Sequence, residues 1–245
     1  MIVVLPICSK DYALMLANLD WQRELDGIKK FKCVLSVDSE TPRNAVAECV
    51  KKAELTFESA RSILYDPPPT SGWPQAPNWA FQRTAISMQF MGEAWFWMEP
   101  DCIPLRSGWL NRWDEEYRKC KKPMMGYIIE EMGHCNGTAV YPANFPQLSS
   151  KTMQVVDLAF DDVMKNDTIH LTHNANHLMD HVWGIHEGQA FSHKGDAAVF
   201  KSWSDVVSWV NLDAVLFHRA KDGSLIHQLR SKKTSIEKII LSHEN

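Results

Sequence analysis

The sequence of 245 residues contains no apolar run approaching the roughly 18 residues that a membrane-spanning helix requires. Its opening residues 1–6 also lack the basic stretch and the cleavage site of a secretory signal. Six cysteines are present, but they form no CxxC pair and no regular framework, which is typical of a reducing compartment. We therefore expect a soluble protein of the cytoplasm without disulfide bonds.

Neither sign of charge dominates, because 26 Lys and Arg residues stand against 30 Asp and Glu residues and the net charge is −4. A chain with this balance has no global attraction for polyanions, so contact with nucleic acid would need a local basic patch. Such clusters are more often solvated helix faces than binding sites. Two are present, formed by Arg112, Arg118, Lys119, Lys121 and Lys122, and by Arg230, Lys232 and Lys233.

Hydrophobic residues make up 45% of the chain and charged residues 23%, which excludes disorder and fibrous architecture. No internal repeat, low-complexity tract or linker divides the sequence. We therefore expect a single domain that covers residues 1–245.

Predicted strands alternate with predicted helices as far as residue 98. Apolar runs predict strands and leucines at near-helical spacing predict helices, which places strands over 2–7, 31–38, 62–65 and 94–98, and helices over 12–25, 43–53 and 78–91. This alternation is typical of an α/β fold with a mostly parallel central sheet flanked by helices. Beyond residue 105 the pattern is α+β, with helices expected over 108–119, 160–165 and 202–210, and strands over 124–129, 138–142 and 214–217.

Two carboxylates, Glu99 and Asp101, directly follow the apolar strand expected over 94–98. Residues two apart on an extended chain point to the same side, so both can hold one divalent cation. A pair of carboxylates suits Mg²⁺ or Mn²⁺ and leaves positions open for a diphosphate. Acidic residues also end strands without binding anything, but ligands of open α/β sheets collect at the carboxyl ends of strands, where this pair lies.

Several segments together resemble one family. They are the opening turn 5–10, Asp38 in the segment 35–40, Asn78 at a helix start, Glu99-Pro100-Asp101, the Gly-rich segment 133–142 and the segment 218–224. These resemble the nucleotide-diphosphosugar transferases of the Rossmann-like GT-A fold, and most closely glycosyltransferase-like proteins of tailed bacteriophages. Glu99-Pro100-Asp101 is similar to the DxD metal motif of that family, with glutamate in first place.

The resemblance implies a nucleotide-binding half over residues 1–105 and an acceptor-side half over residues 106–245. It implies that His218 is a further metal ligand beside Glu99 and Asp101. It also implies a set of residues that contact the nucleotide-sugar donor: Pro6, Cys8, Asp38, Asn78, Asn136, Gly137 and Lys221.

The activity that the resemblance implies is metal-dependent transfer of a hexose from a nucleotide-diphosphate sugar, with a UDP-sugar favoured, to a hydroxyl acceptor. The metal and Lys221 would stabilise the charge that develops on the leaving diphosphate. The likeness to phage proteins points to a hydroxymethylated pyrimidine in DNA as acceptor and to the host cytoplasm as location, while a protein, polysaccharide or lipid-linked glycan remains an alternative acceptor.

Two other hypotheses stay open. A nucleotidyltransferase of the same fold is weaker, because no GxGxR-type loop follows the first strand. A non-catalytic module that binds carbohydrate or DNA through its tryptophans is the third reading, since ten tryptophans supply large apolar faces with a polar group.

An acidic pair, Asp161 and Asp162, stands where the family usually has one at a helix start. An inverting transfer needs a general base for the acceptor hydroxyl, and one of these residues is the candidate. Aspartate at a helix start also caps backbone N–H groups, so a structural role is equally compatible with the sequence. In a retaining enzyme the acids would position acceptor or sugar hydroxyls instead.

Six of the ten histidines lie between His170 and His193, and those at 173, 177 and 181 have the spacing of one helix face. A structural zinc site would want four closed ligands with cysteine partners, and no cysteine follows Cys135. We expect these histidines either to line an acceptor cleft, with His181 and Trp183 as candidates, or to form a solvated face.

Two further aromatic rings, Trp73 and Trp79, belong to a loop beside the expected cleft. Rings in such positions stack on sugars or on an extruded base. Core packing is the alternative, more so for Trp79 than for Trp73.

Overall fold

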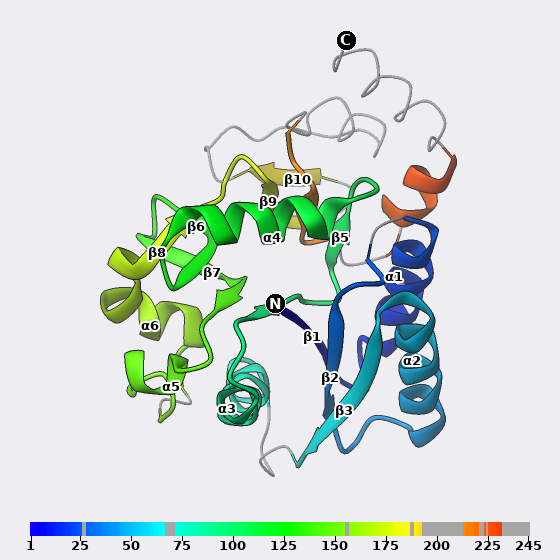
Figure 1. The fold of residues 1–245 in the computed structure, drawn as a ribbon, viewed down its shortest axis with the longest axis horizontal. Coiled ribbons are helices and arrows are strands. Elements are labelled where there is room, and N and C mark those ends of the chain that lie inside the picture. Colours follow the sequence, from blue (N-terminus) through cyan, green and yellow to red (C-terminus); the bar gives the residue numbers. More distant parts are fainter. Residues whose placement is uncertain are drawn as a thin grey trace.

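The computed structural model describes residues 1–25, 28–66, 72–154, 157–186, 189–192, 213–220, 223 and 225–231. A seven-stranded sheet with the order β3-β2-β1-β4-β7-β6-β8 forms the centre of the molecule (Figure 1). A second sheet has four strands in the order β10-β9-β11-β5.

The chain up to residue 97 builds the parallel part of the central sheet. Strands β1 (Ile2–Ile7), β2 (Lys32–Asp38), β3 (Ser59–Tyr65) and β4 (Trp95–Trp97) alternate with helices α1 (Tyr12–Glu24), α2 (Arg43–Thr56) and α3 (Gln75–Met91). Strand β1 pairs in parallel with both β2 and β4, and β2 pairs in parallel with β3. All four strands therefore end at the same edge of the sheet.

The second half of the chain completes both sheets. Strands β6 (Met124–Ile129), β7 (His134–Tyr141) and β8 (Thr172–Asn174) extend the central sheet, with β7 antiparallel to β4 and β6. Strands β5 (Cys102–Pro104), β9 (Met179–His186), β10 (Gln189–Ser192) and β11 (Leu216–His218) form the second sheet. The helical segments are α4 (Trp109–Cys120), α5 (Phe145–Leu148), α6 (Phe160–Thr168) and η1 (Ile169–Leu171), and residues 225–231 are also helical.

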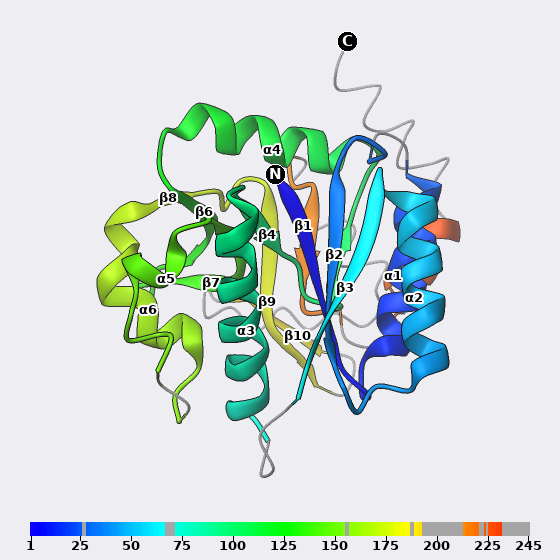
Figure 2. The ribbon, with the colours of Figure 1, turned by 60° about the horizontal axis from the view of Figure 1, so that its bottom comes forward.

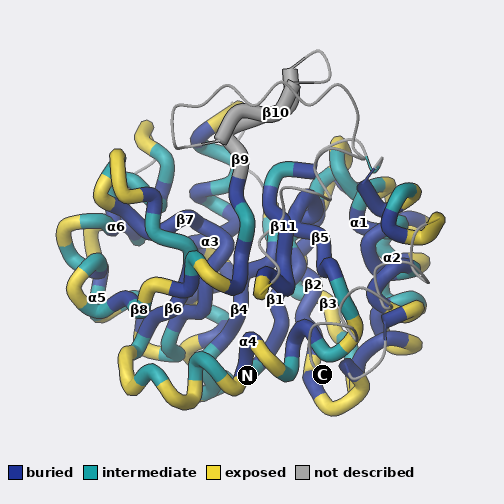
Figure 3. The backbone as a smooth tube through the Cα atoms, turned by 90° about the horizontal axis from the view of Figure 1, so that it is seen from above, coloured by how far each residue is buried: buried dark blue, intermediate teal, exposed yellow. Residues whose placement is uncertain are grey.

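Two hydrophobic cores lie on the two faces of the central sheet, because alternate residues of a strand point to opposite sides. Val3, Leu5 and Ile7 of β1 pack with α1, α2 and α4, whereas Ile2 and Val4 pack with α3 and α6. Figures 1 and 2 show α3 on one face and the pair α1 and α2 on the other. The central strands are buried, while the outer helix faces carry the exposed residues (Figure 3).

The predicted α/β class, with a mostly parallel central sheet flanked by helices, is confirmed. Single boundaries differ: the strand predicted over 62–65 begins at Ser59, and the helix predicted from Asn78 begins at Gln75. An apolar pattern does not mark the start of β3, because the residues of this strand are partly or fully exposed. The helix predicted over 202–210 lies outside the described residues.

The helical arrangement considered for His173, His177 and His181 is wrong. His173 lies in β8, His177 in a turn and His181 in β9. The turn is set by Asn174, whose Oδ1 accepts a hydrogen bond from the backbone N–H of Asn176 at 2.8 Å, a local bond that competes with helix formation. The three histidines consequently share no helix face.

All six cysteines are free thiols. Among the tryptophans whose burial the structure describes, five are fully buried, which confirms core packing for Trp21, Trp95, Trp97, Trp109 and Trp113. Within the part of the chain that the structure describes, no helix combines the length and the apolar character needed to cross a membrane.

Candidate metal and nucleotide site

A cavity of about 630 Å³ opens at the edge of the sheet where β1, β2, β3 and β4 end. Its opposite wall is formed by β7, the start of α6 and the end of β11. Lys221 lies outside the described residues. Every other residue predicted for the site lines this cavity: Pro6, Cys8, Asp38, Asn78, Glu99, Asp101, Asn136, Gly137, Asp161, Asp162 and His218.

Three of these side chains, Glu99, Asp101 and His218, meet at one point. The Nε2 atom of His218 lies 3.1 Å from Oε2 of Glu99 and 3.3 Å from Oδ1 of Asp101. The meeting depends on the second sheet, in which β11 pairs antiparallel with β5 and places His218 opposite Cys102. A residue 119 positions from Glu99 in sequence is thereby brought to the motif.

The turn that carries the two carboxylates is fixed from both sides. Asn18, a fully buried residue of α1, donates hydrogen bonds from Nδ2 to the carbonyl oxygens of Pro100 at 3.1 Å and Cys102 at 2.8 Å. The backbone N–H groups of Arg219 and Ala220 donate to the carbonyl oxygen of Asp101 at 3.1 and 3.0 Å. The turn that carries Glu99 and Asp101 is therefore held by helix α1 and by the segment that follows His218.

The three donor atoms fit a divalent cation. One ligand atom from each residue lies within 4.8 Å of the other two. In an octahedral site with bonds of about 2.1 Å, neighbouring ligands are about 3 Å apart, and the two separations from His218 Nε2, 3.1 and 3.3 Å, match this value. Carboxylate and imidazole groups are both side chains that bind divalent cations in proteins.

Among the described residues, negative charge dominates the cavity. The described lining includes six carboxylates, from Asp11, Asp38, Glu99, Asp101, Asp161 and Asp162, but only Lys10 and Arg219 as basic side chains besides its histidines. Burial opposes protonation of His218, yet its contacts with Asp101 and Glu99 outweigh this and raise its pKa from 6.5 to about 9. A cation held by Glu99, Asp101 and His218 would have to replace the proton of His218.

Asp11 completes this acidic group and was not among the predicted site residues. Burial raises the pKa of Asp11 despite the hydrogen bonds from Cys8, and the charges of Asp101 and Glu99 add to the effect. Its Oδ1 accepts a hydrogen bond from the backbone N–H of Cys8 at 2.8 Å, which fixes the turn after β1. Burial, and then Asp11, raise the pKa of the Cys8 thiol to about 11, so this thiol stays protonated at neutral pH.

The wall opposite the metal ligands holds the acidic pair. Asp161 and Asp162 lie in the first turn of α6, whose N-cap position is Ala159, and Oδ1 of Asp161 accepts a hydrogen bond from the backbone N–H of Asp162 at 3.2 Å. Asp162 lies 3.8 Å from Nζ of Lys165, whereas Oδ2 of Asp161 lies 3.9 Å from Nδ1 of His134. Burial raises the pKa of Asp161, an effect that His134 opposes and the charges of Glu99 and Asp162 reinforce.

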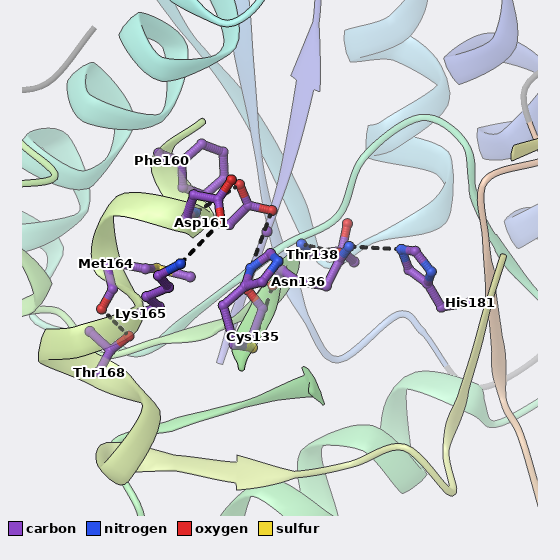
Figure 4. A network of polar contacts seen from close by, with 12 residues as sticks. Cys135, Asn136, Thr138, Phe160, Asp161, Met164, Lys165, Thr168 and His181 are labelled. Atoms are coloured by element: carbon purple, nitrogen blue, oxygen red, sulfur yellow. Dashed lines mark hydrogen bonds and ion pairs between the residues drawn. The ribbon is translucent and has the colours of Figure 1, made fainter. Parts of the chain in front are cut away.

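Strand β7 lines the cavity between the group formed by Glu99, Asp101 and His218 and the start of α6. Asn136 donates from Nδ2 to Nε2 of His181 at 2.9 Å, and its Oδ1 accepts from the backbone N–H of Thr138 at 2.8 Å. An acceptor at Nε2 implies a neutral His181 that carries its proton on Nδ1. The ring of His181 stacks on Tyr127 and meets His218 edge to face. Figure 4 shows Asp161 and His181 on either side of Asn136.

The remaining predicted residues differ in their surroundings. Asn78 lines the cavity, but its amide bonds to the backbone at the start of α6. Trp73 stands at the cavity with 81% of its surface exposed. Trp79 donates from Nε1 to the carbonyl oxygen of Asp66, and Arg83 covers its ring. The side chain of Trp183 lies outside the described part of the structure.

Sequence reasoning missed Asn18, Asp11 and His134. A polar Asn18 on a helix face with Met15 and Leu19 is a usable signal, because buried polar groups are kept for their hydrogen bonds. Asp11 and His134 carry no such signal, since both stand in ordinary polar turns of the sequence.

No protein-family model and no curated protein sequence matches this chain. The galactosyltransferase LgtC, in a complex with donor and acceptor sugar analogs, matches its fold with a TM-score of 0.59 at 10% identity, over 95% of this chain and 96% of that chain. Mouse xyloside xylosyltransferase 1 matches with a TM-score of 0.50 at 9% identity, over 89% of this chain and 96% of its own.

The glycosyltransferase GlyE of Streptococcus pneumoniae TIGR4 matches with a TM-score of 0.52 at 10% identity, over 89% of this chain and 54% of that chain. Identities this low show the fold alone. The chain has the mixed α/β fold, with a mostly parallel central sheet flanked by helices, that these GT-A glycosyltransferases share.

Proposed function

We propose that this protein is a metal-dependent glycosyltransferase that moves a hexose from a nucleotide-diphosphate sugar, such as a UDP-sugar, to a hydroxyl acceptor. One observation carries the proposal: Glu99, Asp101 and His218 meet at the strand ends in a cavity of about 630 Å³. The fold shared with glycosyltransferases supports the same conclusion.

The donor is assigned to the side of the cavity built by residues 1–105. Pro6 and Cys8, at the end of β1, would hold the nucleotide, and Asp38, the last residue of β2, would contact the base or ribose. Asn136 and Gly137 face this region from β7 and would lie against the sugar, and Lys221 would reach the diphosphate. Bound Mn²⁺ or Mg²⁺ would supply the positive charge that a diphosphate needs in so acidic a cavity.

The acceptor is assigned to the side built by residues 106–245, where Asp161 is the candidate general base. Its raised pKa makes it a better proton acceptor than an exposed aspartate, and its place on the cavity wall gives it access to a bound hydroxyl. Asp162, paired with Lys165, would position the acceptor.

The charges favour an uncharged acceptor over DNA. Helix α4, which carries Arg112, Arg118 and Lys119, lies at the amino end of β1, where the N-terminal amine is 3.9 Å from Asp114 (Figure 2). The cavity lies at the other end of β1, about 20 Å away for a strand of this length. Arg230 is paired with Glu24 at the last residue of α1.

A hydroxymethylated pyrimidine in phage DNA would therefore have to be held without these described basic residues. We accordingly rank a glycan or protein hydroxyl first among acceptors. The DNA reading remains the alternative to be tested in the same transfer assay.

Thermal unfolding with UDP- and GDP-sugars, each with and without Mn²⁺, tests the proposal, because a ligand that binds only the folded state raises Tm. We expect one nucleotide sugar to raise Tm only with the metal. Asp101→Asn should abolish that shift and turnover while keeping the fold, since the shape of the side chain is unchanged. Asp213→Asn, at an exposed aspartate outside the cavity lining, is the matched control.

Two results would favour the other hypotheses. Metal-independent binding of a glycan alone would indicate a non-catalytic carbohydrate-binding module. Synthesis of a nucleotide sugar from a nucleoside triphosphate and a sugar phosphate would indicate a nucleotidyltransferase.

A further inference from the structure

We propose that Asn78 is a positioning residue that caps helix α6 from helix α3 and thereby holds Asp161 at the cavity. The inference rests on the proposed function for the role of Asp161. It replaces the expectation that the Asn78 amide contacts the donor.

The N-cap residue of α6 has no capping side chain. It is Ala159, whose methyl group cannot accept a hydrogen bond. Asp161 accepts from the backbone N–H of Asp162, but the N–H of Phe160 needs an acceptor from outside the helix. Asn78 supplies it: its Oδ1 accepts from the backbone N–H of Phe160 at 2.9 Å. Its Nδ2 donates to the carbonyl oxygen of Leu158 at 2.6 Å. The buried amide of Asn78 thus forms hydrogen bonds with the backbone on both sides of Ala159.

The ring of Phe160 fixes the same point from the other side. It stacks on Phe81 of α3 with the centroids 4.0 Å apart and the planes 11° from parallel. Its Cζ atom occupies the space beside Gly137 in β7, where a Cβ atom would lie only 2.7 Å away. Glycine at 137 is therefore required by the approach of this ring.

Asp161 directly follows Phe160, so the contacts that fix Phe160 also fix the backbone position of Asp161. Its carboxylate lines the cavity with His134 as its neighbour at 3.9 Å. Because α6 begins at Phe160, a shift of that residue moves the first turn and the carboxylate with it. Asn78 consequently controls where Asp161 stands without any need to touch a substrate, and Gly137 leaves the space that the Phe160 ring occupies.

Asn78→Ala tests the proposal, with Gln82→Ala as the matched control. Gln82 lies one turn further along α3 and donates a comparable hydrogen bond, from Nε2 to the carbonyl oxygen of Thr152 at 2.9 Å, but it does not line the cavity. Misplacement of a reacting group by about 1 Å can cost on the order of 100-fold in rate.

We expect kcat to fall by about that factor in Asn78→Ala while the donor KM stays within about twofold, and both constants to stay near wild type in Gln82→Ala. Binding of the nucleotide sugar with Mn²⁺, measured by calorimetry, should be unchanged in both variants. A raised donor KM with kcat preserved would overturn the proposal and restore the donor-contact role of Asn78.

Gly137→Ala provides a second route should Asn78→Ala not fold, because it displaces the Phe160 ring and leaves Asn78 intact. The same loss of kcat with an unchanged donor KM is expected. An unchanged kcat, or a raised donor KM with kcat preserved, would contradict the proposal. Hydrogen exchange of the Phe160 amide gives a readout without activity: protection should fall in Asn78→Ala and persist in Gln82→Ala. A wild-type chain that transfers no sugar would refute the proposed function, and the exchange comparison would still decide whether Asn78 holds α6.

Discussion

Metal binding should be coupled to the release of one proton from His218. In the metal-free protein this imidazole is buried against Glu99 and Asp101, and its pKa is about 9. At pH 7 only about one molecule in a hundred then has the neutral ring that can act as a ligand. A cation must displace the proton, so the apparent affinity at pH 7 should be about 100-fold below its limit.

The affinity for Mn²⁺ should consequently rise about tenfold per pH unit between pH 6.5 and 8.5 and level off above pH 9. Calorimetry in buffers of different ionisation enthalpy should detect about one proton released per ion at pH 7. His218→Gln should bind more weakly and with much less dependence on pH. Equal slopes in the two proteins, or no proton release in the wild type, would refute the reasoning.

Protonation of His218 weakens metal binding, but it stabilises the folded metal-free protein. The pKa of His218 is higher in the folded chain than its ordinary value of 6.5, so protonation stabilises the metal-free protein fully below about pH 6.5. This stabilisation is lost as the pH rises through about 9. The Tm of the metal-free protein should therefore fall over this window, while the increase in Tm caused by Mn²⁺ grows.

Three further substitutions have defined outcomes. Asn18→Ala removes both hydrogen bonds to the metal turn and leaves buried carbonyl groups unpaired, at a cost of about 1–3 kcal/mol in unfolding free energy; calorimetry should also show weaker Mn²⁺ binding. Asp11→Asn keeps the oxygen that accepts the Cys8 N–H and removes a buried charge beside Glu99 and Asp101, so the metal-free Tm should rise; a lower Tm would contradict this. Trp73→Ala removes a ring that lines the donor side of the cavity and is 81% exposed, and it should leave Tm unchanged while raising the donor KM in a transfer assay.

Local sequence patterns predicted the central sheet and one edge of the site. The apolar run before Glu99 must be buried on both sides, and the parallel pairing of β4 with β1 puts its end at the carboxyl edge. Asp38 reaches the same edge for the same reason, since β2 is also parallel to β1. These placements follow from strand alternation alone.

Contacts between distant segments could not be derived in this way. His218 was placed by family resemblance, because nothing local indicates that β11 pairs with β5. The partners of Asn78 lie about eighty positions away, and its helical position suggested a ligand contact where the structure has a cap for another helix. A polar side chain inside a helix shows that it needs a partner, but its sequence surroundings do not identify that partner.

The pairing of β11 with β5 also has a consequence for the order in which the molecule is made. Glu99 and Asp101 leave the ribosome more than a hundred residues before His218, so the growing chain carries an acidic turn with an incomplete ligand set. Domains generally fold as units. The three side chains can meet only after β11 has emerged, and a cation captured then would link the turn after β4 to a strand made more than a hundred residues later.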